Sequence, residues 1–202
     1  MFVKVCGLDT VESARVAVEA GADAIGVVIA QGSPRNLSVE AAAEIVRAVH
    51  ADVETVLVVR DMPATQAAET ATSIGVSILQ LHGGYTRDDF SQARRLFDRV
   101  WRATSLSDDT DLHVGAWGEE LLLLDAPQAG SGHRWDLGSL DTGRPDGPWL
   151  LAGGLAPDNV AEAVRLAAPA GVDVSSGVER ARGVKDHDAI RAFVAAARSR
   201  VS

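Results

Sequence analysis

The sequence lacks the features that would place the protein outside the ordinary globular class. It holds a single cysteine, which excludes an internal disulfide and agrees with a reducing compartment. No apolar run reaches the roughly 20 residues that a membrane helix needs, and the N-terminus lacks the positive and then apolar pattern of a signal peptide. These absences predict a cytoplasmic protein without a membrane partner.

Positive charge is also scarce. The chain has 28 acidic against 19 basic residues and a net charge of −9. A nucleic-acid-binding protein would be expected to carry a basic stripe, so no nucleic-acid partner is expected. A small anionic ligand is still compatible with this charge, because backbone N–H groups and a few placed cations can make a local positive pocket.

Length and composition predict one domain over residues 1–202. The chain is long enough for one well-buried core and short for two. Its 47% hydrophobic and 23% charged residues are close to the usual globular mix.

Short apolar runs alternate along the chain with Ala-rich segments at helical spacing, which is typical of βα units around a parallel sheet. Eight runs predict strands: Phe2–Cys6, Ala24–Ile29, Glu54–Val59, Ile78–Leu81, Val100–Ala103, Leu121–Asp125, Trp149–Ala152 and Val172–Val174. The clearest helices are expected at Val11–Ala20, Val39–Val49, Ala64–Ile74, Arg87–Phe97, Asn159–Leu166 and His187–Ser199. Asp9 is expected to cap the first helix with Glu12 reaching back, and Ser38 to cap the second.

Eight such units predict a single-domain (β/α)8 TIM barrel. They leave about 25 residues per unit, so the barrel is near-minimal against a usual length of roughly 250 residues. The alternative is a six-stranded doubly wound sheet. It would need two of the runs to be something other than strands, and no GxGxxG follows the first of them. The Gly-, Asp- and Pro-rich stretch from Gly130 to Pro148 predicts a loop plus a short helix.

In barrel enzymes the reacting groups stand at the C-terminal ends of strands, so the strand ends are the place to look for chemistry. Cys6 ends the first predicted strand, and the following Gly7 allows a sharp turn that leaves the thiol facing the barrel mouth. A thiolate there could act as a base. The alternative is a small buried hydrophobic residue, which is a common fate of a free cysteine.

Asp125 ends the run LLLLD, where four leucines precede a carboxyl group. Partial desolvation in such a setting favours the protonated form, as an acid catalyst requires. The alternative is a structural cap for the next loop.

Two loops rich in Gly and Ser follow the last two predicted strands, in LLAGGL and VDVSSGVE. On a closed barrel these loops are neighbours, and this is where barrels bind phosphate. Small residues let N–H groups approach the phosphate oxygens, and the hydroxyls of Ser175 and Ser176 could add donors.

Several other polar residues have two interpretations. The planar guanidinium of Arg35 is suited to binding a carboxylate. The alternative is that Arg35 is a solvated surface residue. Lys4 and Arg102 are expected to face into the barrel, Lys4 as a member of an ion pair. A hydrogen bond to a neighbouring loop is the favoured role for His82. The remaining histidines have no metal-ligand spacing, so no metal site is expected.

Taken together, these segments resemble the phosphoribosylanthranilate isomerase family almost from end to end. The resemblance is carried by VKVCGL, GADAIGVV with SPRNLS, LQLHG, LLLLD, LAGGLAPDNV, GVDVSSGVE and GVKDHDAI. VCGL and VDVSSGVE with the following KD are specific in combination. The loops after the third and sixth strands depart from the family pattern, with VVRD at Val58–Asp61 and AGSGHRWDL around His133.

The resemblance implies a cofactor-free Amadori rearrangement in tryptophan biosynthesis. N-(5-phosphoribosyl)anthranilate would be converted to 1-(2-carboxyphenylamino)-1-deoxyribulose 5-phosphate, with Asp125 as the acid that opens the ribose ring and Cys6 as the base at C2. Arg35 would hold the anthranilate carboxylate and Asp173 would lie near the sugar. The phosphate-binding residues would be Gly153, Gly154, Ser175, Ser176 and Gly177.

Three alternatives accompany this interpretation. A histidine-pathway isomerase performs the same rearrangement on a bisphosphorylated substrate, but it uses an aspartate at the first strand end and two phosphate grips. A dual-substrate isomerase is disfavoured for the same reason. A non-catalytic phosphosugar-binding barrel would not need both Cys6 and Asp125. The sequence leaves open a monomer or a homodimer.

Overall fold

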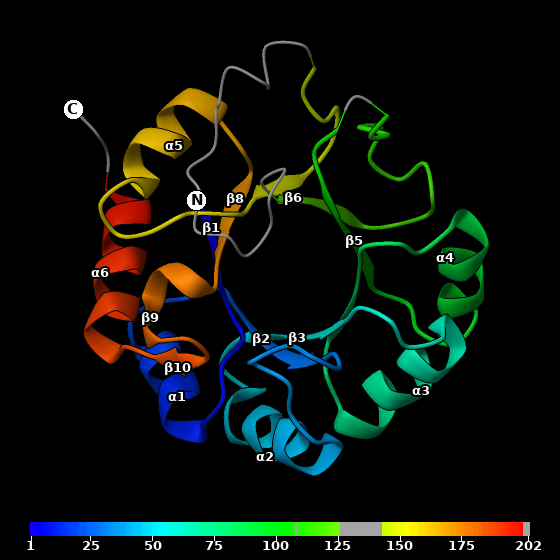
Figure 1. The fold of residues 1–202 in the computed structure, drawn as a ribbon, viewed down its shortest axis with the longest axis horizontal. Coiled ribbons are helices and arrows are strands. Elements are labelled where there is room, and N and C mark those ends of the chain that lie inside the picture. The colour runs from blue at the N-terminus through cyan, green and yellow to red at the C-terminus, as the bar shows by residue number, and fades with distance from the viewer. Residues whose placement is uncertain (108, 126–142, 200–202) are drawn as a thin grey trace.

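The computed structural model describes residues 1–107, 109–125 and 143–199. Eight parallel strands close into a barrel in chain order, with the eighth paired to the first (Figure 1). The predicted (β/α)8 barrel is therefore confirmed, and the open doubly wound sheet is wrong. The strands are β1 (Phe2–Cys6), β2 (Ala24–Ile29), β3 (Glu54–Val59), β4 (Ile78–His82), β5 (Val100–Ser105), β6 (Leu121–Asp125), β7 (Trp149–Leu151) and β8 (Gly171–Val174).

Helices surround the barrel and cover its outer face (Figure 1). In the described ranges they are α1 (Val11–Glu19), α2 (Val39–Val49), α3 (Ala64–Ile74), α4 (Arg87–Arg94), α5 (Val160–Ala167) and α6 (His187–Arg198). Among them, no helix has the length and apolarity to cross a membrane. The described residues between β5 and β6 form turns without a helix. Most of the predicted loop and short helix at Gly130–Pro148, including His133, lies outside the described residues.

Alternation along the strands divides the core into two layers. Val3 and Val5 of β1 point outward and join the larger cluster between the sheet and the helices. Cys6 points inward and joins a smaller cluster inside the barrel, together with Trp101 and Leu123. Both faces of each strand are thus buried, which explains why the strand segments are nearly continuous apolar runs.

The cap of α1 differs from the prediction. The Thr10 side chain, rather than that of Asp9, accepts a hydrogen bond from the Ser13 backbone N–H at 3.1 Å. The helix begins at Val11, so Asp9 lies one residue too early to be the N-cap. Ser38 is confirmed as the cap of α2, where it accepts from the Ala41 N–H at 3.2 Å.

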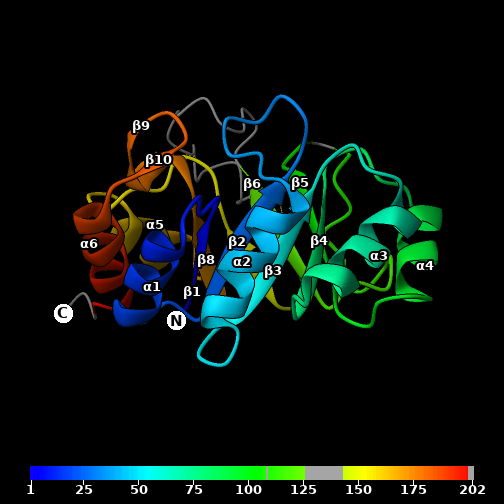
Figure 2. The same ribbon diagram turned by 90° about the horizontal axis from the view of Figure 1, so that it is seen from below.

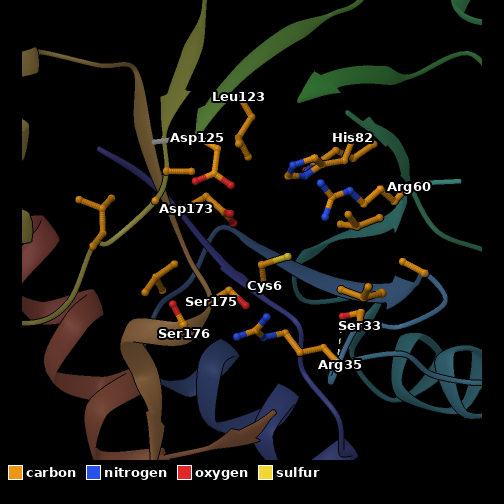
Figure 3. Close-up of a pocket in the computed structure, with 18 of the residues that line it drawn as sticks. Cys6, Ser33, Arg35, Arg60, His82, Leu123, Asp125, Asp173, Ser175 and Ser176 are labelled. Carbon is orange, nitrogen blue, oxygen red and sulfur yellow. Dashed lines mark hydrogen bonds between the residues drawn. The ribbon is translucent and has the colours of Figure 1, made fainter. Parts of the chain in front are cut away.

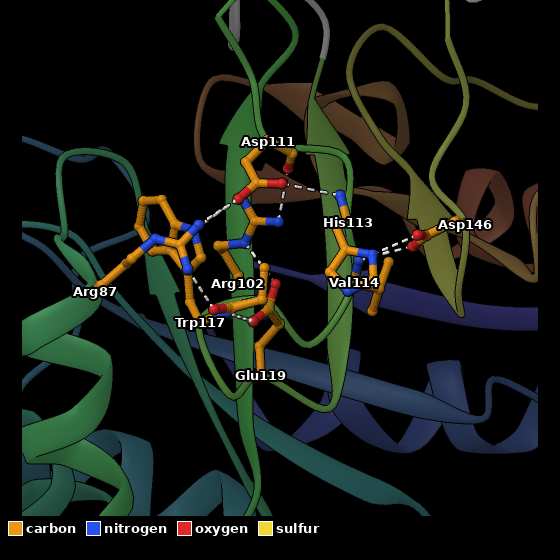
Figure 4. Close-up of polar contacts among 9 residues, drawn as sticks. Arg87, Arg102, Asp111, His113, Val114, Trp117, Glu119 and Asp146 are labelled. Carbon is orange, nitrogen blue, oxygen red and sulfur yellow. Dashed lines mark hydrogen bonds and ion pairs between the residues drawn. The ribbon is translucent and has the colours of Figure 1, made fainter.

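The prediction that Arg102 faces into the barrel is wrong. Its neighbours Trp101 and Ala103 belong to the inner cluster, so alternation sends Arg102 to the outer face. There its Nε donates to Glu119 at 2.7 Å and its guanidinium stacks over the Trp117 ring (Figure 4). The inward-facing cation is Lys4, which donates to Asp173 at 2.8 Å, as predicted for an inner-barrel ion pair.

A small hairpin beyond β8 was not predicted. A 3-10 turn, η2 (Ser176–Val178), leads into two short antiparallel strands, β9 (Glu179–Ala181) and β10 (Val184–Lys185). Figure 2 shows the hairpin above the barrel, at the opposite end from the N-terminus. It therefore adds residues to the end of the barrel where the parallel strands finish.

Candidate active site

A pocket opens at the C-terminal ends of the strands, as the barrel fold requires. It brings together eight of the nine site residues that the sequence predicts (Figure 3). These eight are Cys6, Arg35, Asp125, Gly153, Gly154, Asp173, Ser175 and Ser176. The ninth, Gly177, does not line the pocket. It packs against the backbone of Leu155, which does.

The Cys6 side chain lies at the centre of the pocket floor and is 7% exposed. Burial raises the pKa of its thiol, while the nearby Lys4 ammonium lowers it and the Asp173 carboxylate raises it further. Burial alone would lower the pKa of Lys4, but Asp173 and Cys6 outweigh it, so the Lys4 pKa is raised and the ammonium stays charged. Cys6 thus lies beside a permanent buried cation.

Asp125 reaches the pocket because of the alternation in β6. Leu123 points into the barrel, whereas Leu122 and Leu124 pack outward against the helices. Asp125, two residues after Leu123, therefore lies on the inner face and lines the pocket. It pairs in register with Ser105 of β5, and its strand is separated from β1 by β7 and β8 around the ring (Figure 1). A thiol and a carboxyl group thus face the same space from different sides.

The loop after β7 exposes backbone donors to the pocket. Gly153 and Gly154 both have left-handed backbone angles, with φ of 85° and 66°. Their N–H groups make no hydrogen bond to any residue that the structure describes. Asn159 fixes the loop, since its Oδ1 accepts from the Ala156 N–H at 2.8 Å and its Nδ2 donates to the Gly154 carbonyl at 2.9 Å. Free N–H groups on a fixed loop suit an anion such as phosphate.

Gly177 permits the loops after β7 and β8 to touch. A Cβ atom at this position would lie only 1.8 Å from the Leu155 carbonyl oxygen. Any side chain would therefore push the two loops apart. This close approach brings the loop that holds Ser175 and Ser176 against the loop that holds Gly153 and Gly154, and all four residues line the pocket.

Arg35 follows β2 but is held by the hairpin beyond β8. Its Nε and Nη2 donate to the two carboxylate oxygens of Glu179 at 2.6 and 2.9 Å. Glu179 also accepts from the Lys185 ammonium at 2.9 Å and from the Gly183 N–H at 3.0 Å. Although burial would raise the pKa of Glu179, these contacts lower it to about 2. Arg35 is thus an ion-paired residue with one edge on the pocket, not a solvated surface arginine.

Lys185 lies beneath the loop after β8. It is buried, and its ammonium donates to the Ser175 carbonyl at 2.8 Å. Burial lowers the Lys185 pKa, and the carboxylate of Glu179 opposes that effect. Glu179, Lys185 and the pocket-lining Arg60 were not singled out from the sequence. The opposite charges of Glu179 and Lys185 in VSSGVERARGVKD were the available signal, but only the hairpin brings these two residues together.

His82 lines the pocket at the end of β4. The expected hydrogen bond to a neighbouring loop is not found among the described residues. Burial lowers the His82 pKa to about 4, and the charges of Arg60 and Lys4 act in the same direction. The imidazole is therefore neutral at physiological pH and contributes a polar but uncharged wall.

Comparisons with known proteins agree with this geometry. The family model described as N-(5'phosphoribosyl)anthranilate (PRA) isomerase matches residues 3–196. A crystal structure of TrpF from Jonesia denitrificans is 56% identical, with a TM-score of 0.92 over 98% of this chain and 97% of that one. The N-(5'-phosphoribosyl)anthranilate isomerase of Haloferax volcanii is 42% identical over 98% of this chain and 93% of its own length. A phosphoribosyl anthranilate isomerase in complex with reduced 1-(o-carboxyphenylamino)-1-deoxyribulose 5-phosphate is 32% identical, with a TM-score of 0.83 over 98% of each chain.

Proposed function

The chain belongs to the N-(5'-phosphoribosyl)anthranilate isomerase family and is an isomerase of tryptophan biosynthesis, and we propose that Cys6 and Asp125 perform its proton transfers. The reaction is the Amadori rearrangement of N-(5-phosphoribosyl)anthranilate. The observation that carries the assignment is that this thiol and this carboxyl group line one pocket together with the Gly- and Ser-rich loops after β7 and β8.

Asp125 acts as the acid in the first step. It gives its proton to the ring oxygen of the ribose, the bond from that oxygen to C1 breaks, and the nitrogen lone pair forms a C=N bond to C1. The result is an open-chain, protonated Schiff base. A carboxyl group at the end of an apolar strand suits this donor role.

Cys6 acts as the base in the second step. Its thiolate removes the proton from C2, and the electron pair of that C–H bond forms a C1=C2 double bond while the nitrogen becomes neutral. The Cys6 thiol then returns a proton to C1, and the proton of the C2 hydroxyl passes to the Asp125 carboxylate, which gives the ketone and restores both groups. No electrons enter or leave the substrate, so no redox partner is required.

The Lys4–Asp173 pair supports the base. A buried thiolate is costly in an apolar barrel, and the Lys4 ammonium offsets its charge. Asp173 balances the charge of Lys4 in the absence of substrate and lines the pocket, where its carboxylate can accept a hydrogen bond from a hydroxyl of the sugar.

Binding uses polar groups around the rim of the pocket. We assign the substrate phosphate to the N–H groups of Gly153 and Gly154 and to the loop at Ser175, Ser176 and Gly177. Arg35 is assigned to the anthranilate carboxylate through Nη1, which has no hydrogen-bond partner among the described residues. The described residues supply one pair of Gly- and Ser-rich loops, which suits a substrate with one phosphate rather than the bisphosphorylated substrate of the histidine-pathway alternative.

We propose a cytoplasmic enzyme whose single domain spans residues 1–202 and whose partner is the phosphorylated substrate, not a membrane or a nucleic acid. All of the assigned groups come from one chain, so the site is compatible with either a monomer or a homodimer.

A fluorescence assay that follows the loss of phosphoribosylanthranilate tests the proposal. The wild-type protein should turn over the substrate, whereas Asp125→Asn and Cys6→Ser should each lower kcat by orders of magnitude. Circular dichroism should show both variants folded. Wild-type turnover no faster than that of Asp125→Asn would disprove the proposed roles.

A further inference from the structure

We propose that Arg60 is a second residue that binds the anthranilate carboxylate, from the side of the pocket opposite the phosphate loops. This inference rests on the proposed substrate-binding function of the pocket. Arg60 directly follows β3, and its side chain lines the pocket (Figure 3).

The closed barrel determines which end of the substrate Arg60 can meet. In a ring of eight strands, β3 and β4 lie opposite β7 and β8. The phosphate is bonded to C5 of the ribose and the anthranilate to C1, so the two anionic groups are at opposite ends of the substrate. With the phosphate on the loops after β7 and β8, the aromatic ring extends across Cys6 toward β3 and β4. Figure 3 shows Arg60 and His82 on that side, away from Ser175 and Ser176.

The two pocket arginines differ in how much of the guanidinium is free. Arg35 uses Nε and Nη2 to bind Glu179, which leaves only Nη1 for a ligand. Arg60, in contrast, makes no hydrogen bond or ion pair with any residue in the described ranges. A guanidinium without an acidic partner has its full fork of donors available for a bidentate carboxylate contact.

The Arg60 side chain lines the pocket beside Gly83 and His82. A Cβ atom placed on Gly83 would lie 3.7 Å from Arg60 Nε and 3.8 Å from its Cγ, so the arginine side chain passes beside this glycine with room for about one carbon atom between them. The neighbouring imidazole of His82 is neutral, since burial and then the charge of Arg60 lower its pKa to about 4. On this side of the pocket Arg60 has no ion pair with a described residue, while the pocket-lining acids Asp125 and Asp173 come from β6 and β8.

Paired ligands test the assignment. One ligand is reduced 1-(o-carboxyphenylamino)-1-deoxyribulose 5-phosphate, and the other is the same molecule with a phenyl ring that lacks the carboxyl group. Kd is measured by calorimetry for the wild type, Arg60→Gln and Arg182→Gln. Arg182 is a matched control, because it is exposed and lines the adjoining groove but not the pocket.

The expected result is that Arg60→Gln raises the Kd of the carboxylated ligand by about tenfold. This is the order expected for the loss of one charge-assisted hydrogen-bonded contact. The ligand without the carboxyl group should bind both proteins equally, and Arg182→Gln should leave both affinities unchanged. Equal losses for the two ligands would overturn the proposal, because they would assign Arg60 to the phosphate or the sugar. Unchanged affinities would overturn it in favour of a solvated arginine.

The same measurements separate this inference from the function on which it rests. Failure of the wild type to bind either ligand would overturn the substrate-binding function itself. Normal wild-type binding and turnover with an unaffected Arg60→Gln would overturn only the role of Arg60.

Discussion

Glu179 binds the guanidinium of Arg35 with both carboxylate oxygens, at 2.6 and 2.9 Å, although the two residues are 144 positions apart in the chain. The same carboxylate binds Lys185, whose ammonium supports the Ser175 carbonyl. A single acidic side chain therefore fixes the arginine after β2 relative to the loop after β8. We therefore predict that Glu179 positions both Arg35 and the loop at Ser175.

Replacement of Glu179 by Gln should raise KM for phosphoribosylanthranilate by about tenfold and change kcat much less, because Arg35 and Lys185 lose the charge that holds them but the reacting groups stay in place. Steady-state kinetics with the fluorescent substrate would measure this split. A fall in kcat with an unchanged KM would contradict the positioning role.

Glu120→Gln is a matched control for that substitution. Glu120 also binds an arginine with both oxygens, at 3.0 and 2.9 Å to Arg99, but it precedes β6 at the other end of the barrel. The control should cost at most about 1 kcal/mol of stability, as exposed ion pairs do. Its kinetic constants should match those of the wild type.

The strands and their ends were predictable from the sequence because both depend on local patterns. Apolar runs of strand length identify β1 and β6 within one residue, and Cys6 and Asp125 follow as the last residues of those runs. Barrel closure then places both on one rim. The face on which a residue lies is less local, because it depends on which neighbours point inward. Arg102 was therefore assigned to the wrong face of β5, while Lys4 was assigned correctly.

The Arg35–Glu179 contact was not predictable for a different reason. The hairpin that carries Glu179 has strands of three and two residues, too short to show a periodic pattern. The contact also forms only when β8 closes against β1 and brings the loop after β2 near the end of the chain. Arg60 shows the same limit, since its place opposite the phosphate loops follows from the order of strands around the ring.

Alkylation of Cys6 should become faster as the pH rises. Burial raises the pKa of this thiol above its ordinary value, so the thiolate, which is the reactive form, is a minor species near neutral pH. The rate with iodoacetamide should increase by about tenfold per pH unit between about pH 7 and pH 9. Cys6 is the single cysteine of the chain, so the mass of the intact protein reports the reaction. A rate that is already constant at pH 7.5 would show a lowered pKa instead.

His82 should make the protein less stable in mild acid. Its pKa is lowered from 6.5 to about 4 in the folded state, so between these values the unfolded chain binds a proton that the folded protein does not. Stability therefore rises with pH across this window and falls as the pH drops through it. The wild type should lose about 2 kcal/mol through this residue between about pH 7 and pH 5.

Urea unfolding of the wild type and His82→Gln at both pH values measures this contribution. The glutamine side chain does not titrate. Between the two pH values the variant should therefore lose about 2 kcal/mol less of its free energy of unfolding than the wild type does. Equal losses in the two proteins would mean that His82 is not held neutral in the folded state.

Gly177→Ala should weaken phosphate binding, although residue 177 does not line the pocket. The new Cβ atom would lie 1.8 Å from the Leu155 carbonyl oxygen, so one of the two loops must move. Such overpacking typically costs about 1–3 kcal/mol of stability, and the moved N–H groups should raise KM by about tenfold or more. Gly84→Ala is the control, since Gly84 also follows a barrel strand but has open space around it. If Gly177→Ala folded and kept the wild-type KM, the contact between the loops would have no part in holding the phosphate.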